Sequence, residues 1–172
     1  TPSNNTGPSS AVDGSFYLFI EASSNNTFGA VGNNATVILE SPCVDLSAQS
    51  AANINFNYHM FGNSIGTLRL EATTNGSDWV VIWSESGNQG NAWLSQSISL
   101  GAYLGTTIKL RFRGTTANSW QGDMAIDNIS ITEGATTSAL VSNPLLGANL
   151  DEESFINVYP NPVVNLLNID MK

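Results

Sequence analysis

Short runs of alternating apolar and polar residues recur along most of this chain, and they are the feature that most restricts its fold. Alternation with period two is typical of strands that bury one face, and no stretch repeats with the helical period. Turn residues such as Asn75-Gly76 separate the runs, as expected between neighbouring antiparallel strands. Strands are expected over residues 16–21, 36–40, 54–61, 67–73, 79–84, 93–100, 107–113 and 124–132. The pattern therefore predicts an all-β protein, an antiparallel two-sheet β-sandwich of the jelly-roll type.

The same alternation predicts which side chains face the core and which face outward. In the run that ends at Met60 every second residue is apolar, and the residues between them are amides and the single histidine. Four of the five basic residues of the chain alternate with apolar residues in two other runs. The residues expected to point outward are Asn53, Asn55, Asn57, His59, Arg69, Glu71, Lys109, Arg111 and Arg113.

The polar residues of the chain are mostly uncharged. Charged residues make up 11% of the 172 residues, against about a quarter in ordinary globular proteins. The net charge is −9, and a chain so poor in Lys and Arg is not expected to bind nucleic acid. No apolar run approaches the roughly 18 residues that a membrane-spanning helix needs. The abundance of Asn, Ser, Thr and Gly indicates a secreted or cell-surface β-protein.

A single cysteine, Cys43, restricts the covalent chemistry of the chain. One thiol forms no internal disulfide and does not make a cysteine-based zinc site. We expect Cys43 to be a small buried hydrophobic residue, and a mixed disulfide with a segment outside this chain is the alternative.

The composition changes after Glu133, which suggests a domain boundary. Residues 134–154 are rich in small and polar residues and contain an acidic cluster, as is typical of a linker. Residues 155–172 form a second apolar segment that is too short to fold alone. We therefore expect a folded domain over residues 1–133, a linker over 134–154, and a segment over 155–172 that docks on the domain, pairs with another chain or stays disordered.

The basic residues concentrated on two strands are the first candidate binding site. If these strands share a sheet with the asparagine row, its outer face carries cations and amides. Arginine binds carboxylate or sulfate through two parallel hydrogen bonds, and amides bind sugar hydroxyls, so this face suits an anionic polysaccharide. The alternative is a solvated face neutralised by Glu40, Glu71 and Glu85. The candidate ligand-binding residues here are Arg69, Lys109, Arg111, Arg113 and His59.

Two further residues are candidates with open alternatives. Trp120 lies in a loop of Gly, Asn and Ser and is the aromatic residue most expected at the surface. Its expected roles are to stack on a sugar or a partner protein, or to close the end of the sandwich. His59 is either part of the ligand face or a structural hydrogen-bonding residue. Without a second histidine, a catalytic zinc site is not expected, and no nucleophile, base and acid can be assembled from the sequence.

Several segments resemble the MAM family, in the family's order, over residues 13–133. They are Leu39-Glu40-Ser41-Pro42, the run from Phe56 to Gly62, Gly66-Thr67-Leu68, the run from Trp83 to Trp93, and the run from Gly122 to Ile129. The resemblance implies an extracellular jelly-roll module without catalysis, and the missing cysteine pairs are typical of bacterial members. It also implies a larger secreted parent, foremost a metalloprotease or a polysaccharide-degrading enzyme.

The two ends of the chain depart from the family or extend beyond it. The acidic, aromatic first strand of the family is not found, and residues 155–159 or 166–169 are expected to fill that gap within one molecule or between two, by strand exchange or self-association. The segment from Asn157 to Pro162 resembles the start of the C-terminal sorting domain of type IX secretion in Bacteroidota-type bacteria, here truncated.

The family resemblance also implies a structural calcium ion near the terminal strands. Asp127 interrupts an apolar strand, and a carboxylate there needs a cation, backbone N–H groups or an arginine to offset its burial. Calcium takes six to eight oxygen ligands, and the candidates are Asp127, Asp13 and Glu21. The alternative is that Asp127 accepts backbone hydrogen bonds or pairs with an arginine.

These observations together predict a non-catalytic accessory module of a larger secreted bacterial protein. Its predicted ligand is an anionic polysaccharide. The alternative is a protein–protein adhesion or domain-packing module of a secreted metalloprotease.

Overall fold

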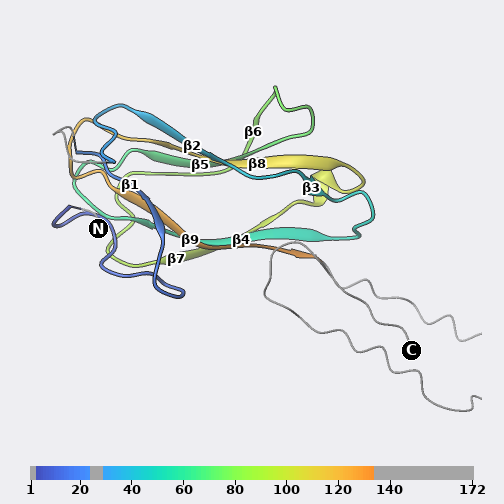
Figure 1. Ribbon diagram of the computed structural model, residues 1–172, viewed down its shortest axis with the longest axis horizontal. Coiled ribbons are helices and arrows are strands. Elements are labelled where there is room, and N and C mark those ends of the chain that lie inside the picture. The colour runs from blue at the N-terminus through green and yellow to red at the C-terminus, as the bar shows by residue number, and fades with distance from the viewer. Residues whose placement is uncertain (1–2, 24–28, 134–172) are drawn as a thin grey trace, which may run out of the picture. The chain divides into compact units, whose positions relative to one another are not determined.

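The computed structural model describes residues 3–23 and 29–133, which form two antiparallel β-sheets stacked face to face (Figure 1). One sheet has the strand order β1-β9-β4-β7, and the other has the order β2-β8-β5-β6, with β3 also paired to β8. The strands are β1 (Leu18–Ile20), β2 (Thr36–Glu40), β3 (Val44–Asp45), β4 (Ala52–Met60), β5 (Thr67–Thr73), β6 (Val80–Ser86), β7 (Leu94–Ser99), β8 (Thr107–Thr115) and β9 (Met124–Glu133). The predicted two-sheet sandwich is confirmed.

The strand bounds follow the alternating runs closely. β2 and β5 have the predicted bounds, and the other six predicted strands differ by at most two residues at either end. β3 was not predicted, because two residues are too few to show a period. A single 3₁₀ turn, η1 (Gly101–Tyr103), precedes β8. Within the described ranges, no helix is long and apolar enough to cross a membrane.

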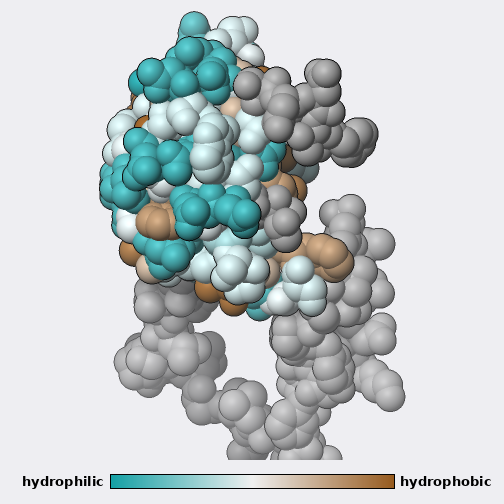
Figure 2. Space-filling model, turned by 90° about the vertical axis from the view of Figure 1, so that its left-hand side faces the viewer, coloured by the Kyte–Doolittle hydropathy of each residue, from teal (hydrophilic) through white to brown (hydrophobic). Residues whose placement is uncertain are grey.

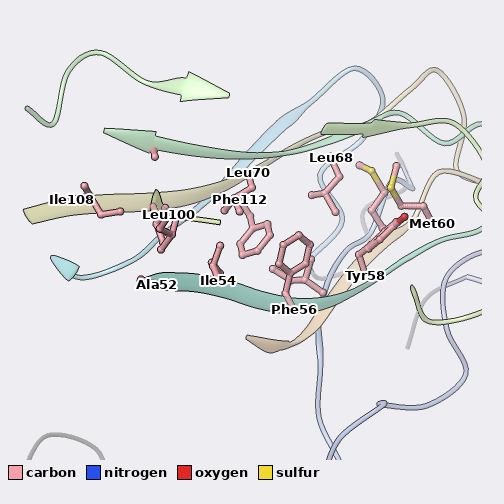
Figure 3. Close-up of a cluster of buried hydrophobic side chains, with 14 of the residues drawn as sticks. Ala52, Ile54, Phe56, Tyr58, Met60, Leu68, Leu70, Leu100, Ile108 and Phe112 are labelled. Atoms are coloured by element: carbon pink, nitrogen blue, oxygen red, sulfur yellow. The ribbon is translucent and has the colours of Figure 1, made fainter. Parts of the chain in front are cut away.

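The core lies between the two sheets and is built from the inward residues of the central strands (Figure 3). Phe56 of β4 packs edge-on against Phe112 of β8, with ring centroids 4.9 Å apart, and against Trp83 of β6 at 5.0 Å. Phe56 therefore joins the two layers. Full burial of each such side chain contributes about 1.5–3 kcal/mol.

Residues 3–17, the lead-in, have no regular secondary structure, but they pack against the domain (Figure 1). The indole Nε1–H of Trp93 donates a hydrogen bond to the Ser10 carbonyl at 2.9 Å. The Tyr17 hydroxyl donates to the Pro8 carbonyl at 3.0 Å, and the Tyr17 and Trp93 rings are 5.7 Å apart. The lead-in thus covers one end of the outer face of the four-stranded sheet.

β1 pairs with only the first three residues of β9, from Met124 to Ile126. On its other side β9 pairs with β4 from Met124 to Glu133, with one register shift. Residues 155–159 and 166–169, which were predicted to fill a missing strand, lie outside the described residues.

Candidate functional site

The outer face of the five-stranded sheet carries the four predicted basic residues. β5 and β8 are neighbours, and their register places Arg69 opposite Arg113, Glu71 opposite Arg111, and Thr73 opposite Lys109. Leu70 and Phe112, which alternate with these residues, are buried in the core. The prediction that the basic residues share one sheet face is therefore consistent with the strand register.

Two of the four basic residues form ion pairs that hold the sheet together. The Arg111 Nε donates to Glu71 Oε2 at 2.6 Å, and its guanidinium lies 4.0 Å from the centroid of the Trp79 ring. Lys109 Nζ lies 2.8 Å from Glu40 Oε1, and this hydrogen bond raises the pKa of Lys109. Glu71 was expected in solvent, but it is buried, because the Arg111 side chain lies against it.

Arg69 and Arg113 form no ion pair with any residue that the structure describes. They face each other directly across two strands, where opposite Cβ atoms are roughly 4.5–5.5 Å apart and like charges repel. The next row along the same face carries only hydroxyls, with Thr36 hydrogen-bonded to Thr115 and Thr67 to Ser86. Two half-exposed cations beside a hydroxyl row form a surface that is complementary to an oxyanion.

The asparagine row does not belong to this face. β4 lies in the four-stranded sheet, so Asn53, Asn55 and Asn57 point away from the sandwich on the opposite side from the arginines. The predicted composite face of cations and amides is therefore wrong. Strand alternation fixes the face on which each residue lies, but it does not fix the sheet that a strand joins.

His59 is buried, with 2% of its surface exposed, although its position in β4 predicted an outward side chain. Its Nε2 lies 3.2 Å from Asn91 Oδ1, and its ring packs 5.5 Å from Trp93. Its Nδ1 has no hydrogen-bond partner among the described residues. Burial lowers the pKa of His59. Trp93, Phe61 and Asn91 surround the ring, so His59 fits the structural alternative rather than a ligand-binding role.

A shallow polar hollow of about 310 Å³ lies on the outer face of the four-stranded sheet. Its lining includes Asn55 and Asn57 from β4, Ser95 and Ser97 from β7, and Asn128 from β9. A register shift between β4 and β9 creates the hollow, because Asn57 pairs with Asp127 whereas Asn55 pairs with Ser130. The sequence offered only the Asn-Ser pattern as a signal for this site.

The predicted calcium ligands lie in two separate places. Asp127 Oδ2 accepts hydrogen bonds from the backbone N–H groups of Val12 (2.9 Å) and Asp13 (3.2 Å), and its Oδ1 accepts from the N–H of Asn128 (2.8 Å). Backbone donors therefore satisfy Asp127, as in one of the alternatives. Glu21 lies past the other end of the β1–β9 ladder, about 13 Å away at the usual rise per residue.

Glu21 is instead beside Asp123, which is fully buried. Asp123 accepts hydrogen bonds from the backbone N–H groups of Ala22 at 2.8 Å and Ser3 at 2.9 Å. Burial, with the negative charge of Glu21, raises the pKa of Asp123 to about 6. Asp123 is buried because the lead-in folds back over it, with hydrogen bonds that involve Ser3 and Thr6. Across the described ranges, no group of three His, Cys, Asp or Glu residues is placed to hold a metal ion.

Trp120 and Cys43 are both at the surface. Trp120 is 46% exposed in the loop between β8 and β9, as predicted for a surface aromatic residue. The side of the molecule seen in Figure 2 is largely hydrophilic. Cys43 is exposed at the turn between β2 and β3, so the prediction of a buried cysteine is wrong. Pro42 stands at this turn, and the chain there leaves the sheet before β3 begins.

Residues 1–136 match the family described as MAM domain, meprin/A5/mu. The chain belongs to the MAM family. Among curated proteins, this MAM domain is 32% identical over 135 residues to MAM domain-containing glycosylphosphatidylinositol anchor protein 1 of Gallus gallus, covering 76% of the chain and 13% of that protein. It is 31% identical over 179 residues to MAM domain-containing glycosylphosphatidylinositol anchor protein 2 of Mus musculus, covering 96% of the chain and 18% of that protein. The chain thus spans less than a fifth of these relatives.

The fold of this MAM domain is also similar to a solved structure. The K1 cleaved adhesin domain of Lys-gingipain from Porphyromonas gingivalis W83 superposes with a TM-score of 0.53 at 16% identity, covering 69% of this chain and 74% of that domain. At that identity the likeness concerns the fold alone. Family membership supports a non-catalytic binding or adhesion module rather than an enzyme.

Proposed function

We propose that this MAM domain binds an anionic polysaccharide through Arg69 and Arg113 on the outer face of the five-stranded sheet. The observation that carries the proposal is their direct cross-strand pairing without a carboxylate partner among the described residues. In a chain of net charge −9, carboxylates are abundant, yet within the described part of the chain this pair has none as a partner. A bound anion removes the repulsion between the two guanidinium groups.

The surroundings of the pair fit a sugar polymer rather than a small inorganic anion. The hydroxyl row of Thr36, Thr115, Thr67 and Ser86 lies two residues along the strands, about 7 Å from the arginines. That spacing is comparable with the step from one sugar ring to the next. An acidic group of one ring thus meets Arg69 and Arg113 while hydroxyls of the next ring meet the row.

Affinity electrophoresis tests this proposal. The full chain is run in native gels that contain alginate or dextran sulfate, with a polymer-free gel as the reference for mobility. We expect retardation that Arg113→Ala reduces at least about tenfold in apparent affinity. Lys109→Ala removes the same charge from the same strand but from a residue already paired with Glu40, and it is expected to leave retardation nearly unchanged. Equal losses in both variants, or no retardation, contradict the proposal.

We also propose that the parent protein is secreted or held at the cell surface. Relatives named as glycosylphosphatidylinositol anchor proteins support this location. The resemblance of residues 157–162 to a type IX sorting signal supports a bacterial export route, and the family resemblance supports an extracellular hydrolase as parent. Mass spectrometry of culture medium and surface fractions from the producing cells tests the location.

Calcium binding is a further part of the proposal, with Glu21 and Asp123 as the carboxylates that fit it. The Ser3 and Ser23 hydroxyls lie beside Glu21 and add neutral oxygens of the kind that calcium takes. Asp127 is less suited, because it lies at the other end of the β1–β9 ladder, away from Glu21. Calcium is expected to raise the Tm of the chain relative to chelator, and Glu21→Gln is expected to remove that shift while Asp13→Asn keeps it. A calcium shift that survives Glu21→Gln contradicts this assignment.

A second candidate function is protein–protein adhesion, the role that family resemblance implies for MAM domains. It is favoured by apolar side chains exposed along one side of the sandwich, on β1, β2 and β9. These residues are Leu18, Phe19, Ile38, Leu39 and Ile129, each between 38% and 54% exposed. Sedimentation across a concentration series tests it, because an adhesive apolar edge gives association that Ile38→Ser weakens.

A further inference from the structure

We infer that the polar hollow on the four-stranded sheet is a second binding site, specific for the hydroxyl groups of an uncharged glycan. The hollow lies on the face of the sandwich opposite to Arg69 and Arg113, so this inference stands apart from the proposed anionic site. It is lined by Asn55, Phe56, Asn57, Ser95, Gln96, Ser97 and Asn128, none of which is ionisable.

The chemistry of the lining selects against ions and in favour of neutral polar groups. Amides and hydroxyls both donate and accept hydrogen bonds, as sugar hydroxyls do, whereas an anion needs cations or converging donors. Asp127, next to Asn128, is the nearest carboxylate in sequence, and backbone N–H groups occupy both of its oxygens, those of Val12 and Asp13 at Oδ2 and that of Asn128 at Oδ1. A sugar hydroxyl therefore finds suitable partners in the hollow without having to displace an ion pair.

Hydrogen bonds within the sheet hold the lining residues in fixed orientations. Asn57 is buried, its amide nitrogen donates to the Ser95 hydroxyl at 2.8 Å, and its Oδ1 accepts from the Asn128 amide at 3.3 Å. Ser95 thereby keeps its O–H free to donate outward, and Asn128 keeps its Oδ1 free to accept. Asn55 is held in a similar way by Thr132 at 3.0 Å. Donors and acceptors that are already oriented lose little conformational entropy when a ligand binds.

The backbone at Asn128 is an independent sign of function. Asn128 adopts a positive φ of 51° at the register shift between β4 and β9, a conformation that costs energy for residues other than glycine. Bulges of this kind redirect side chains, and they are common beside binding sites. Here the bulge directs the Asn128 amide to Asn57 at the edge of the hollow.

An aromatic residue precedes the strand that lines one side of the hollow. Trp93 comes immediately before β7, two residues before Ser95, and its half-buried indole donates a hydrogen bond to the lead-in. Its remaining exposed surface suits stacking against the apolar face of a sugar ring. The site then combines hydrogen bonds with one aromatic contact, as neutral sugars require.

Affinity electrophoresis with uncharged polymers tests the inference. The full chain is run in gels containing hydroxyethylcellulose, dextran or galactomannan, and retardation by at least one polymer is expected. Ser97→Ala and Asn128→Gly are expected to reduce the apparent affinity for it about tenfold. Both changes preserve the fold, because Ser97 is exposed and glycine accepts the positive φ of residue 128. Asn53→Ala, on the same face but outside the hollow, is the control and is expected to bind normally.

Three results overturn the inference. They are no retardation by any of the three neutral polymers, unchanged retardation in both Ser97→Ala and Asn128→Gly, and loss of neutral-polymer binding in Arg113→Ala. The last variant also separates the two proposals. If the anionic site is wrong, Arg113→Ala behaves like the wild type on every polymer. The inference about the neutral glycan is then still decided by Ser97→Ala and Asn128→Gly on the neutral polymers.

Discussion

The two outer faces of this sandwich are built from the same alternating pattern but differ in chemistry. On the five-stranded sheet the outward residues include Arg69, Arg111 and Arg113, and the acidic residues there serve to pair with cations. On the four-stranded sheet the outward residues of β4 and β7 are asparagines and serines that hydrogen-bond one another. Because a core about 10 Å thick separates the sheets, each face can meet a different ligand.

The comparison also separates residues that hold the fold from residues that are free for a ligand. On the basic face Arg111 forms an ion pair with the buried Glu71. On the neutral face Asn57 forms hydrogen bonds with Ser95 and Asn128. Beside each of these stands a less constrained group, Arg69 or Arg113 on one face and Ser97 on the other. A substitution in the first kind of residue is expected to change stability, and a substitution in the second kind is expected to change binding.

The largest expected effect is the loss of stability when Arg111 is removed. Arg111→Ala leaves the buried Glu71 carboxylate without its partner, and it is expected to lower the free energy of unfolding by about 3 kcal/mol. Urea unfolding measures the change. Arg69→Ala on the neighbouring strand is the control and is expected to stay within about 0.5 kcal/mol of the wild type. Similar values for the two variants refute the division between structural and free arginines.

Salt is expected to separate the two faces more sharply than any single substitution on the neutral face. Raising NaCl from about 50 mM to about 500 mM screens exposed charges, so the affinity for alginate or dextran sulfate is expected to fall at least about tenfold. Retardation by a neutral polymer is expected to change by less than about twofold over the same range, because no ion pair is involved. Affinity gels run across the salt series measure both, and parallel losses contradict the comparison.

The buried His59, on β4 of the four-stranded sheet, predicts a smaller, pH-dependent change in the free energy of unfolding. Burial lowers the pKa of His59, so as the pH falls below about 6.5 the unfolded chain takes up the proton first and stability is lost. Above that pH the contribution is fully present. The loss is at most about 1.4 kcal/mol per pH unit.

His59→Gln keeps a polar side chain facing Asn91 without titrating, and it isolates this effect. The raised pKa of Asp123 acts in the opposite sense, because its ionisation destabilises the fold as the pH rises from about 4 to about 6. The difference between wild type and His59→Gln cancels that contribution. Between pH 7 and pH 5 the wild type is expected to lose more unfolding free energy in urea titrations than the variant. Equal slopes show that His59 is accessible to solvent after all.

The smallest effect is expected at Trp120, which lies in a loop outside both faces. Trp120→Ala is expected to change the free energy of unfolding by less than about 0.5 kcal/mol, since the side chain is 46% exposed. Retardation by anionic and neutral polymers is expected to stay within about twofold of the wild type. A large loss of binding on one polymer shows that the loop, rather than a sheet face, carries that ligand.

Much of the fold is readable from local sequence because each strand carries its own alternation. The segment from Thr67 to Thr73 is a strand with the predicted bounds, and its Leu68 and Leu70 are buried as expected. The positions of the free arginines on β5 and β8 followed from the same rule. These features depend only on neighbouring residues within one strand.

The remaining features depend on contacts between distant parts of the chain. Nothing local in β4 indicates that it pairs with β7 and β9 rather than with β5, so the sequence could not show whether the asparagines share a sheet with the arginines. Glu71 and His59 occupy outward positions but are buried, Glu71 against Arg111 and His59 against Trp93. The hollow beside Asn128 depends on a register shift between two strands about 70 residues apart in sequence, which no single-strand pattern reveals.

The central claim is that the two outer faces bind different polymers independently. The most direct measurement is affinity electrophoresis of Arg113→Ala and Asn128→Gly, each on one anionic and one neutral polymer. The account predicts that Arg113→Ala loses only the anionic polymer and that Asn128→Gly loses only the neutral one. Loss of both polymers in either variant, or of neither polymer in both variants, contradicts it.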